Sequence, residues 1–204
     1  MSAPHRVPSR AALLAATLFV IVGTTPAGAL PVAPAQDMSL GDPHAPVTII
    51  EYASVGCPHC ADWANDVFPL LRKKYIDTGK VRFELHEMLT GSANLAAAGF
   101  LLARCAAPDK YFQVVDDIYA QQADIVRGGI DTLAKVGEHA GIDRPRFDSC
   151  LQDSAALEAL NARTQADAQA HGVTGTPTFF VGTERLEGEQ SLEALDAAIA
   201  RAKR

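Results

Sequence analysis

The sequence predicts an α/β domain whose two halves are separated by an all-helical insertion. A strand, a helix and a second strand follow one another over residues 47–88, and strand character returns only at residues 178–187. Between these two stretches, residues 93–171 carry helical patterning almost throughout. The order strand, helix, strand favours a right-handed βαβ unit. A chain of 204 residues is long enough for one such domain with an inserted subdomain.

The first 29 residues have the features of a secretory signal peptide. Arg6 and Arg10 supply positive charge, residues 11–23 form an apolar run, and Ala27-Gly28-Ala29 matches an A-x-A cleavage site. The apolar run is short for a transmembrane helix, which needs about 20 apolar residues, but an uncleaved anchor is an open alternative. We expect cleavage after Ala29, a periplasmic or secreted protein, and a flexible lead-in over residues 30–40.

The charge of the chain argues against nucleic acid as a partner. The net charge is −6, and removal of a leader with two arginines and no acidic residue makes it −8. Binding of phosphates needs clustered Lys and Arg, whereas the main basic cluster here is Arg72-Lys73-Lys74, which we expect on a solvated helix face. Export also allows paired cysteines to persist as disulfides.

The first half of the α/β domain is expected to be a strand, a helix and a strand. Residues 47–54 are apolar on both faces, which is typical of a buried central strand. An amphipathic helix follows, in which Pro69 should kink the helix and Gly79 should end it. Residues 80–88 then alternate as a second strand does. Its inward-facing residues should be Val81, Phe83 and Leu85.

The middle of the chain is predicted to be helical, and the sheet resumes after it. The predicted helices cover residues 93–107, 110–124, 130–139 and 155–171, with a shorter piece at 147–151. Residues 178–181 regain strand character. Residues 182–188 are typical of a hairpin turn with a short strand at 185–187, and residues 192–201 predict a last amphipathic helix.

The motif Cys57-Pro58-His59-Cys60 lies where the first strong strand gives way to a helix. The start of a helix stabilises a thiolate through unpaired N–H groups and the positive end of the helix dipole, and pKa values of such cysteines fall to roughly 3.5–7.5. Pro58 suits the first helical turn, where a missing N–H does little harm. His59 can direct a positive or hydrogen-bonding edge toward the Cys57 sulfur. The motif therefore indicates thiol–disulfide exchange.

Metal binding is the chemical alternative for these cysteines. Cys57, Cys60, Cys105 and Cys150 could in principle form a zinc site with four thiolates. The second pair lacks the C-x-x-C spacing, and export favours oxidation. Covalent haem attachment needs a histidine directly after the second cysteine of the motif, and Ala61 stands there. We therefore expect neither a metal nor a cofactor.

Two motifs and the segment between them carry a resemblance to a known family. These are the run from Glu51 to Cys60, the helical insert, and Gly175-Thr176-Pro177-Thr178-Phe179-Phe180-Val181. Together they resemble the DsbA-type periplasmic thiol oxidoreductases of the thioredoxin-fold superfamily, over roughly residues 40–200. The resemblance implies a thioredoxin-like domain made of residues 41–90 and 172–204, with the helical insertion at residues 91–171.

The resemblance also implies roles for the site residues. Cys57 is expected to be the exposed nucleophile and Cys60 the buried resolving cysteine. Thr176-Pro177 is expected to contain a cis bond and to bind substrate, although sequence alone would favour an ordinary trans turn. The dipeptide Pro58-His59 resembles that of oxidising members, whereas a threonine at position 176 also occurs in isomerase-type relatives.

Glu51 interrupts an apolar strand six residues before Cys57. One interpretation is a carboxylate at the strand end that reaches water. The other follows from the resemblance, in which a buried acid accepts or relays the proton of the resolving cysteine, Cys60. Burial would raise the pKa of Glu51 and suit it to proton transfer near neutral pH.

Cys105 and Cys150 lie in the predicted helical insertion. They are either buried free cysteines or, as an even leftover pair in an exported protein, a structural disulfide. Some relatives carry a second disulfide, so the resemblance permits this pairing without requiring it.

The leading functional hypothesis is an exported, monomeric oxidase of dithiols. Its substrates would be unfolded or reduced exported proteins, and a membrane-bound thiol oxidase would reoxidise it. The alternatives are a disulfide isomerase or reductase of the same fold, or a thioredoxin-like chaperone or binding module. Isomerases of this superfamily usually have a dedicated dimerisation domain, and the sequence contains no spare domain of that kind.

Overall fold

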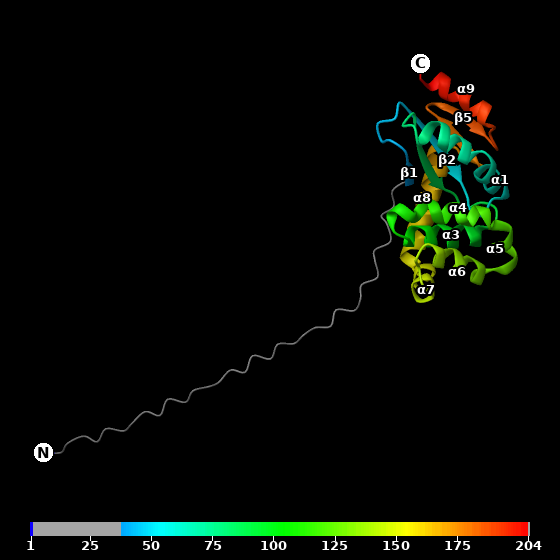
Figure 1. Ribbon diagram of the computed structural model, residues 1–204. Helices are drawn as coiled ribbons and strands as arrows, with labels where there is room; N and C mark the ends of the chain where they lie inside the picture. Colours follow the sequence, from blue (N-terminus) through cyan, green and yellow to red (C-terminus); the bar gives the residue numbers. More distant parts are fainter. Residues whose placement is uncertain (2–37, 204) are drawn as a thin grey trace.

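The computed structural model describes Met1 and residues 38–203 (Figure 1). Residues 2–29 of the expected signal peptide and residues 30–37 of the expected lead-in lie outside these described residues. The expectation of a lead-in is wrong for its last three residues, because Met38–Leu40 forms strand β1. Its backbone pairs with a neighbouring strand, and the side chains of Met38 and Leu40 pack against the core. Among the described residues, no helix combines the length and the apolar character needed to cross a membrane.

The described residues form a five-stranded mixed sheet in the order β1-β3-β2-β4-β5. Its central strand, β2 (Val47–Ala53), runs parallel to β3 (Val81–Glu87), as the predicted βαβ unit requires. On the other side β2 pairs antiparallel with β4 (Thr178–Val181), which continues into β5 (Glu184–Glu187). The two halves of the domain, about 90 residues apart in the sequence, therefore meet on the two edges of one buried strand.

The helical segment after β2 is broken in the way that its proline predicts. Helix α1 (Pro58–Asp66) ends at Val67, and α2 (Phe68–Leu71) continues into η1 (Arg72–Ile76), a turn of π-helix. Pro69 lies in the first turn of α2, where its missing N–H leaves no helical bond unmade. The break precedes Pro69 by two residues, and Gly79 ends the segment with a φ of 69°.

The insertion contains more and shorter helices than the sequence predicts. The single helix expected over residues 110–124 is two, because the chain bends at Gln121. The short piece expected at residues 147–151 begins earlier, where the Asp143 carboxylate accepts a hydrogen bond from the Arg146 N–H. The helical elements are α3 (Ala93–Cys105), η2 (Pro108–Lys110), α4 (Tyr111–Ala120), α5 (Gln122–Gly128), α6 (Ile130–His139), α7 (Arg144–Leu151) and α8 (Ser154–His171), with α9 (Leu192–Ala202) after the sheet.

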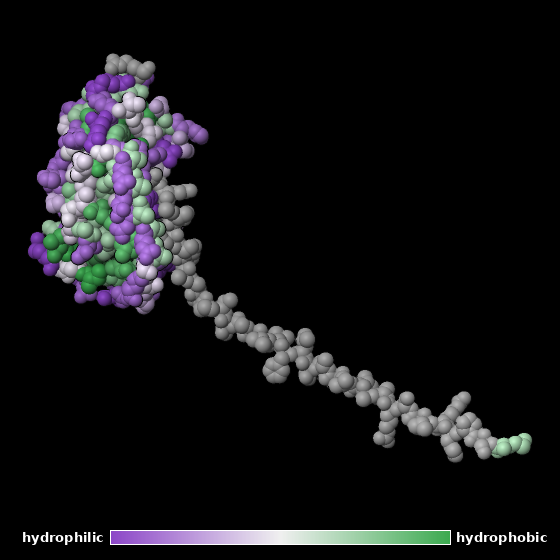
Figure 2. Space-filling view, turned by 180° about the vertical axis from the view of Figure 1, so that it is seen from behind, coloured by the Kyte–Doolittle hydropathy of each residue, from purple (hydrophilic) through white to green (hydrophobic). Residues whose placement is uncertain are grey.

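The helices of the insertion gather at one end of the molecule, and α9 lies at the other (Figure 1). On the face that Figure 2 shows, hydrophobic residues are more prominent toward the insertion, and the end that carries α9 is more hydrophilic. The large exposed apolar side chains Val126 and Ile130 both belong to the insertion.

A buried ionic cluster fastens the insertion to the sheet. Glu87, at the end of β3, accepts hydrogen bonds from Arg104 Nε at 2.7 and 2.9 Å and from the Tyr111 hydroxyl at 2.7 Å. Arg163 of α8 pairs with the same carboxylate. Removing one partner from such a buried group is costly, since it leaves a charge uncompensated. One carboxylate thus joins β3 to α3, α4 and α8.

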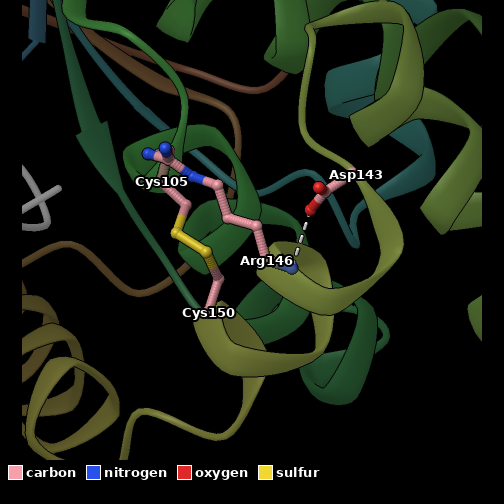
Figure 3. The surroundings of a disulfide bond; sticks show 4 residues. All are labelled: Cys105, Asp143, Arg146 and Cys150. Carbon is pink, nitrogen blue, oxygen red and sulfur yellow. Dashed lines mark hydrogen bonds between the residues drawn. A yellow bond between two sulfur atoms is a disulfide. The ribbon is translucent and has the colours of Figure 1, made fainter. Parts of the chain in front are cut away.

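A disulfide closes the far side of the insertion. Cys105 at the end of α3 is bonded to Cys150 in α7, with their Cα atoms 6.1 Å apart (Figure 3). The Arg146 guanidinium donates a hydrogen bond of 2.6 Å to the Cys105 carbonyl. The Cys105–Cys150 disulfide excludes the alternative of a zinc site with four thiolates, because two of the four sulfurs are bonded to each other.

Replacing Cys105 and Cys150 by alanine should lower the free energy of unfolding by about 4 kcal/mol, because the bond closes a 45-residue loop in the unfolded chain. Urea unfolding followed by circular dichroism measures the loss. The matched control replaces Cys57 and Cys60 by serine and keeps the Cys105–Cys150 disulfide. Equal stability of the alanine variant and the native protein would contradict the prediction.

Candidate active site

The motif Cys57-Pro58-His59-Cys60 forms the first turn of α1, and its two cysteines differ in their exposure to solvent. Cys57 is the N-cap residue in an extended conformation, and Pro58 is the first residue of the helix. The Cys57 residue is 7% exposed and Cys60 is fully buried. Both cysteines are reduced. The residue nearer the surface can meet a substrate, whereas Cys60 is reached only through its partner.

The surroundings of Cys57 favour its thiolate. They lower its pKa to about 5, mainly because the Cys60 thiol is hydrogen-bonded to its sulfur. Burial acts in the opposite direction and raises the pKa of Cys57. Hydrogen bonds from the Thr176 side chain and from the backbone N–H groups of Cys60 and His59 lower it further. The pKa of Cys60 is raised by its hydrogen bond to Cys57, by burial and by the charge of Glu51. At neutral pH the pair therefore carries its charge on Cys57 and its proton on Cys60.

His59 differs from the expectation that its ring would point at the Cys57 sulfur. The ring is exposed, and its Nδ1 lies 2.6 Å from Oε1 of Glu189. Glu189 raises the pKa of His59 by hydrogen bonding and by its charge, and the charge of Cys57 adds to this. The direct contact of His59 with the sulfur is made by its backbone N–H. Sequence reasoning missed Glu189, which follows the β4–β5 hairpin.

Thr176-Pro177 lies against the motif, and its peptide bond is cis, as the resemblance implies. The Cys57 sulfur lies 3.4 Å from the Thr176 carbonyl oxygen. The Thr176 hydroxyl shares a 2.6 Å hydrogen bond with the hydroxyl of Thr90, the residue that follows β3 by three positions. Residues from three separate parts of the chain thus meet at Cys57.

The loop before Cys57 packs directly on the loop after β3. The Ser92 N–H donates to the Gly56 carbonyl at 2.9 Å, and the Ser54 hydroxyl donates to the Thr90 carbonyl at 2.9 Å. A Cβ on Gly56 or Gly91 would overlap backbone atoms of the opposite loop, and Gly91 also has a φ of 68°. Glycine is needed at both positions. Sequence reasoning missed this contact, for which two glycines flanking strand ends are the only sequence signal.

Gln122 ties the insertion to the active-site loop. Its buried side-chain amide donates hydrogen bonds to the carbonyl oxygens of Val55 at 2.8 Å and Cys57 at 3.1 Å. The sequence carries no signal for this contact, which joins residues 65 or more positions apart. The insertion therefore helps to position the motif.

Glu51 is buried in β2, where it pairs with Leu85 of β3 and Phe179 of β4. It is 3% exposed, so the interpretation as a carboxylate that reaches water is wrong. Burial, and next the charges of Cys57 and Asp116, raise its pKa well above the ordinary value. Its Oε1 has no hydrogen-bond partner among the described residues. A protonated acid beside Cys60 fits the expected relay, which stays a prediction.

One exposed group within residues 38–203 has the spacing of metal ligands. Nδ1 of His59 and carboxylate oxygens of Asp62 and Glu189 lie within 4.8 Å of one another. All three residues are on the surface, so the group does not form an enclosed site.

Comparison with known proteins agrees with this geometry. A family model described as Thioredoxin matches residues 34–201. A protein of Rickettsia bellii, provisionally named a protein-disulfide oxidoreductase, is 33% identical over 170 residues, which cover 82% of this chain and 64% of that protein. The chain thus spans less than two thirds of the length of this relative.

Two solved structures share the fold. That of alpha-DsbA1 from Wolbachia pipientis has a TM-score of 0.75 at 23% identity, covering 85% of this chain and 93% of its own. That of oxidised BdbD from Bacillus subtilis has a TM-score of 0.73 at 19% identity, covering 82% and 92%. At these identities the likeness establishes the thioredoxin fold with a helical insertion.

Replacing Cys60 by alanine should raise the pKa of Cys57 from about 5 to about 6–7, because a hydrogen bond to a charged group contributes about 1.5–3 kcal/mol. Replacing Cys60 by serine keeps an O–H donor and should leave the pKa of Cys57 lower than alanine does. The ultraviolet absorbance of the thiolate against pH measures both. Equal pKa values in the two variants would rule out this hydrogen bond as the main cause.

Replacing Gln122 by leucine should cost about 1–3 kcal/mol of unfolding free energy, because two buried carbonyl groups lose their donor. The control is Gln121→Leu, since the amide of Gln121 bonds to the Asp117 carbonyl at the end of α4. Urea unfolding compares them. A loss no larger than that of the control would show that the Gln122 contacts are dispensable.

Proposed function

This chain belongs to the thioredoxin family, and we propose that it is an exported thiol:disulfide oxidoreductase that introduces disulfides into other exported proteins through Cys57 and Cys60. The observation that carries the proposal is the difference in exposure and in pKa between the two cysteines. Cys57 lies near the surface with its pKa lowered to about 5, and Cys60 is buried with its pKa raised. The names of relatives that it resembles agree with this activity.

The reaction begins with the disulfide form of the motif. A thiolate of the substrate attacks the Cys57 sulfur, a substrate–Cys57 bond forms, and the Cys57–Cys60 bond breaks. Cys60 leaves with the electron pair and takes a proton from Glu51. A second thiolate of the substrate then attacks the substrate sulfur of the mixed disulfide and releases Cys57 as a thiolate. The substrate has lost two electrons, and the motif has gained them.

The low pKa of Cys57 explains the direction of exchange. Cys57 is the leaving thiol when the mixed disulfide is resolved, and a thiol of low pKa leaves faster. Stabilising the Cys57 thiolate also stabilises the reduced form of the enzyme. The sign follows from the lowered pKa: the extra stability of the reduced form is lost as the pH falls through about 5 and grows as it rises above that value. At neutral pH the disulfide is therefore an oxidant.

Substrate binding is assigned to Thr176 and Pro177. The Thr176 carbonyl lies 3.4 Å from the Cys57 sulfur, so a peptide attached to Cys57 would run beside this backbone. An extended substrate segment that pairs with the backbone of Thr176 would be held with its cysteine at Cys57. Specificity would then come from few side-chain contacts, as suits an enzyme with many protein substrates.

Export and reoxidation complete the proposal. The leader-like first 29 residues support action in the periplasm or outside the cell. There a membrane-bound thiol oxidase would accept the two electrons and restore the Cys57–Cys60 disulfide. Thr176, which also occurs in isomerase-type relatives, makes an isomerase or reductase the second candidate. A chaperone or binding module would have no use for the lowered pKa of Cys57.

The reduction potential of the Cys57–Cys60 pair should be about −210 mV. The thioredoxin nucleophile has a pKa of about 7 and a potential of about −270 mV, so a pKa about two units lower adds about 60 mV. Equilibration with glutathione buffers, followed by trapping of free thiols, measures the potential. A value near that of thioredoxin would favour the reductase. If the Cys57→Ser variant oxidised a reduced protein at the native rate, both enzyme hypotheses, the oxidase and the isomerase or reductase, would be contradicted.

A further inference from the structure

One face of helix α4 lies against Glu51 and has no role in the reaction as described so far. Phe112 and Tyr119 each lie three or four residues from both Val115 and Asp116, so these four residues share one face. With Glu51 they line part of a cavity of about 10 Å³ between β2, α1 and α4. That volume is about the least that one water molecule needs.

Two buried polar atoms of this cavity lining lack protein partners. They are Oε1 of Glu51 and the hydroxyl of Tyr119, and neither has a hydrogen-bond partner among the described residues. Leaving such groups unsatisfied is costly, and a buried water usually makes two to four hydrogen bonds to groups of this kind. Most of the lining is apolar, but the cavity has about the space for one water, and these two atoms are the partners that such a water would bridge.

Asp116 connects this cavity to the surface. It is half-buried, and it also lines a larger hollow of about 330 Å³ with Arg72 and Asp117. Both Asp116 and Tyr119 belong to the inner cavity and to the outer hollow. The two spaces thus adjoin along one face of α4, and together they lead from Glu51 toward solvent.

We propose that Tyr119 and Asp116, with a water in this cavity, form the route by which protons pass between Glu51 and solvent. The proposal rests on the proposed function, in which Glu51 gives one proton to the departing Cys60 sulfur. Glu51 is then a buried carboxylate and must regain one proton, which Asp116 takes from solvent and passes inward. When the disulfide is restored, Glu51 first releases its proton outward along the route and then takes the proton of the Cys60 thiol. Tyr119 and Asp116 are positioning residues, since neither touches the reacting sulfurs.

The charges around Asp116 suit it to this task. Burial raises the pKa of Asp116 to about 6. The charge of Arg72 in η1 lowers this pKa, and the charge of Asp117 raises it. From the inner side, Asp116 itself contributes to the raised pKa of Glu51. The pKa of Tyr119 is raised well above its ordinary value by burial and by the charges of Cys60 and Glu51. Tyr119 therefore keeps its proton and can act as a fixed hydrogen-bonding link, while Asp116 exchanges protons near neutral pH.

The test follows the proton on Glu51 directly. Oxidised protein is mixed with excess dithiothreitol, and the infrared carbonyl band of the protonated Glu51 side chain, assigned by its absence in Glu51→Gln, is recorded over time. The band should fall as Cys60 leaves and then recover. Recovery should be at least about tenfold slower in Tyr119→Phe and in Asp116→Asn, a smaller effect than the 10²–10⁴-fold typical of a group that gives its proton to the reacting atom. Asp124→Asn removes an exposed carboxylate of α5 that lines neither space, so it is the matched control and should recover at the native rate.

Two further measurements separate a proton route from a structural role. The reduction potential should be the same in Tyr119→Phe as in the native protein, since loss of an uncharged hydroxyl from the route changes a rate and not the equilibrium. The pH profile of turnover with oxidised glutathione should lose its inflection near pH 6 in Asp116→Asn and keep it in Asp124→Asn. Tyr119→Phe removes one hydroxyl without a protein partner, so the variant should fold, and urea unfolding verifies this for each protein.

The outcomes distinguish the two proposals. A band that falls and recovers at the same rate in the native protein, Tyr119→Phe and Asp116→Asn would overturn the route and leave the role of Glu51 intact. A band that never falls in the native protein, while exchange through Cys57 proceeds, would overturn both the Glu51 step and the route. Slow recovery in Asp124→Asn as well would show a general effect of removing a carboxylate from the insertion and would also overturn the route.

Discussion

The hydrogen bond between the Cys60 thiol and the Cys57 sulfur is the interaction on which the rest of the site depends. It joins two chemically identical side chains and makes them unlike, because one keeps the proton and the other the charge. Burial of Cys60 prevents its ionisation, and the first turn of α1 presents N–H groups to Cys57. Two neighbouring groups support this asymmetry: the Thr176 side chain lowers the pKa of Cys57, and the charge of Glu51 raises the pKa of Cys60.

The helical insertion is part of the active site as well as a cover for the sheet. Gln122 holds the carbonyl of Cys57, and α4 supplies the wall opposite Glu51. Such contacts need an insertion that is held firmly against the sheet. The buried Glu87 cluster fixes it at the end of β3, and the Cys105–Cys150 bond ties α3 to α7. Stability of the insertion and chemistry of the motif are therefore coupled through a few buried polar contacts.

Proton movement places a further constraint on this architecture. A thiolate held at a pKa of about 5 can leave and return without a proton, whereas a fully buried Cys60 cannot. In the proposed reaction this proton comes from Glu51, which is itself buried and must then exchange protons with solvent. The proposed route along α4 would provide that exchange.

Features that depend on neighbouring residues could be predicted from the sequence. The period of apolar side chains located β2, β3, β4 and most helices, and the strand-to-helix junction placed Cys57 at the start of α1. The resemblance, and no local pattern, supplied the cis bond before Pro177. The folded chain was needed to show that β1 pairs with β3, that Gln122 contacts Cys57, and that Glu51 and Tyr119 line the same cavity. Hydrogen bonds within a helix and alternation along a strand are set by residues a few positions apart, whereas burial, and the pKa values that follow from it, depend on segments that only the folded chain brings together.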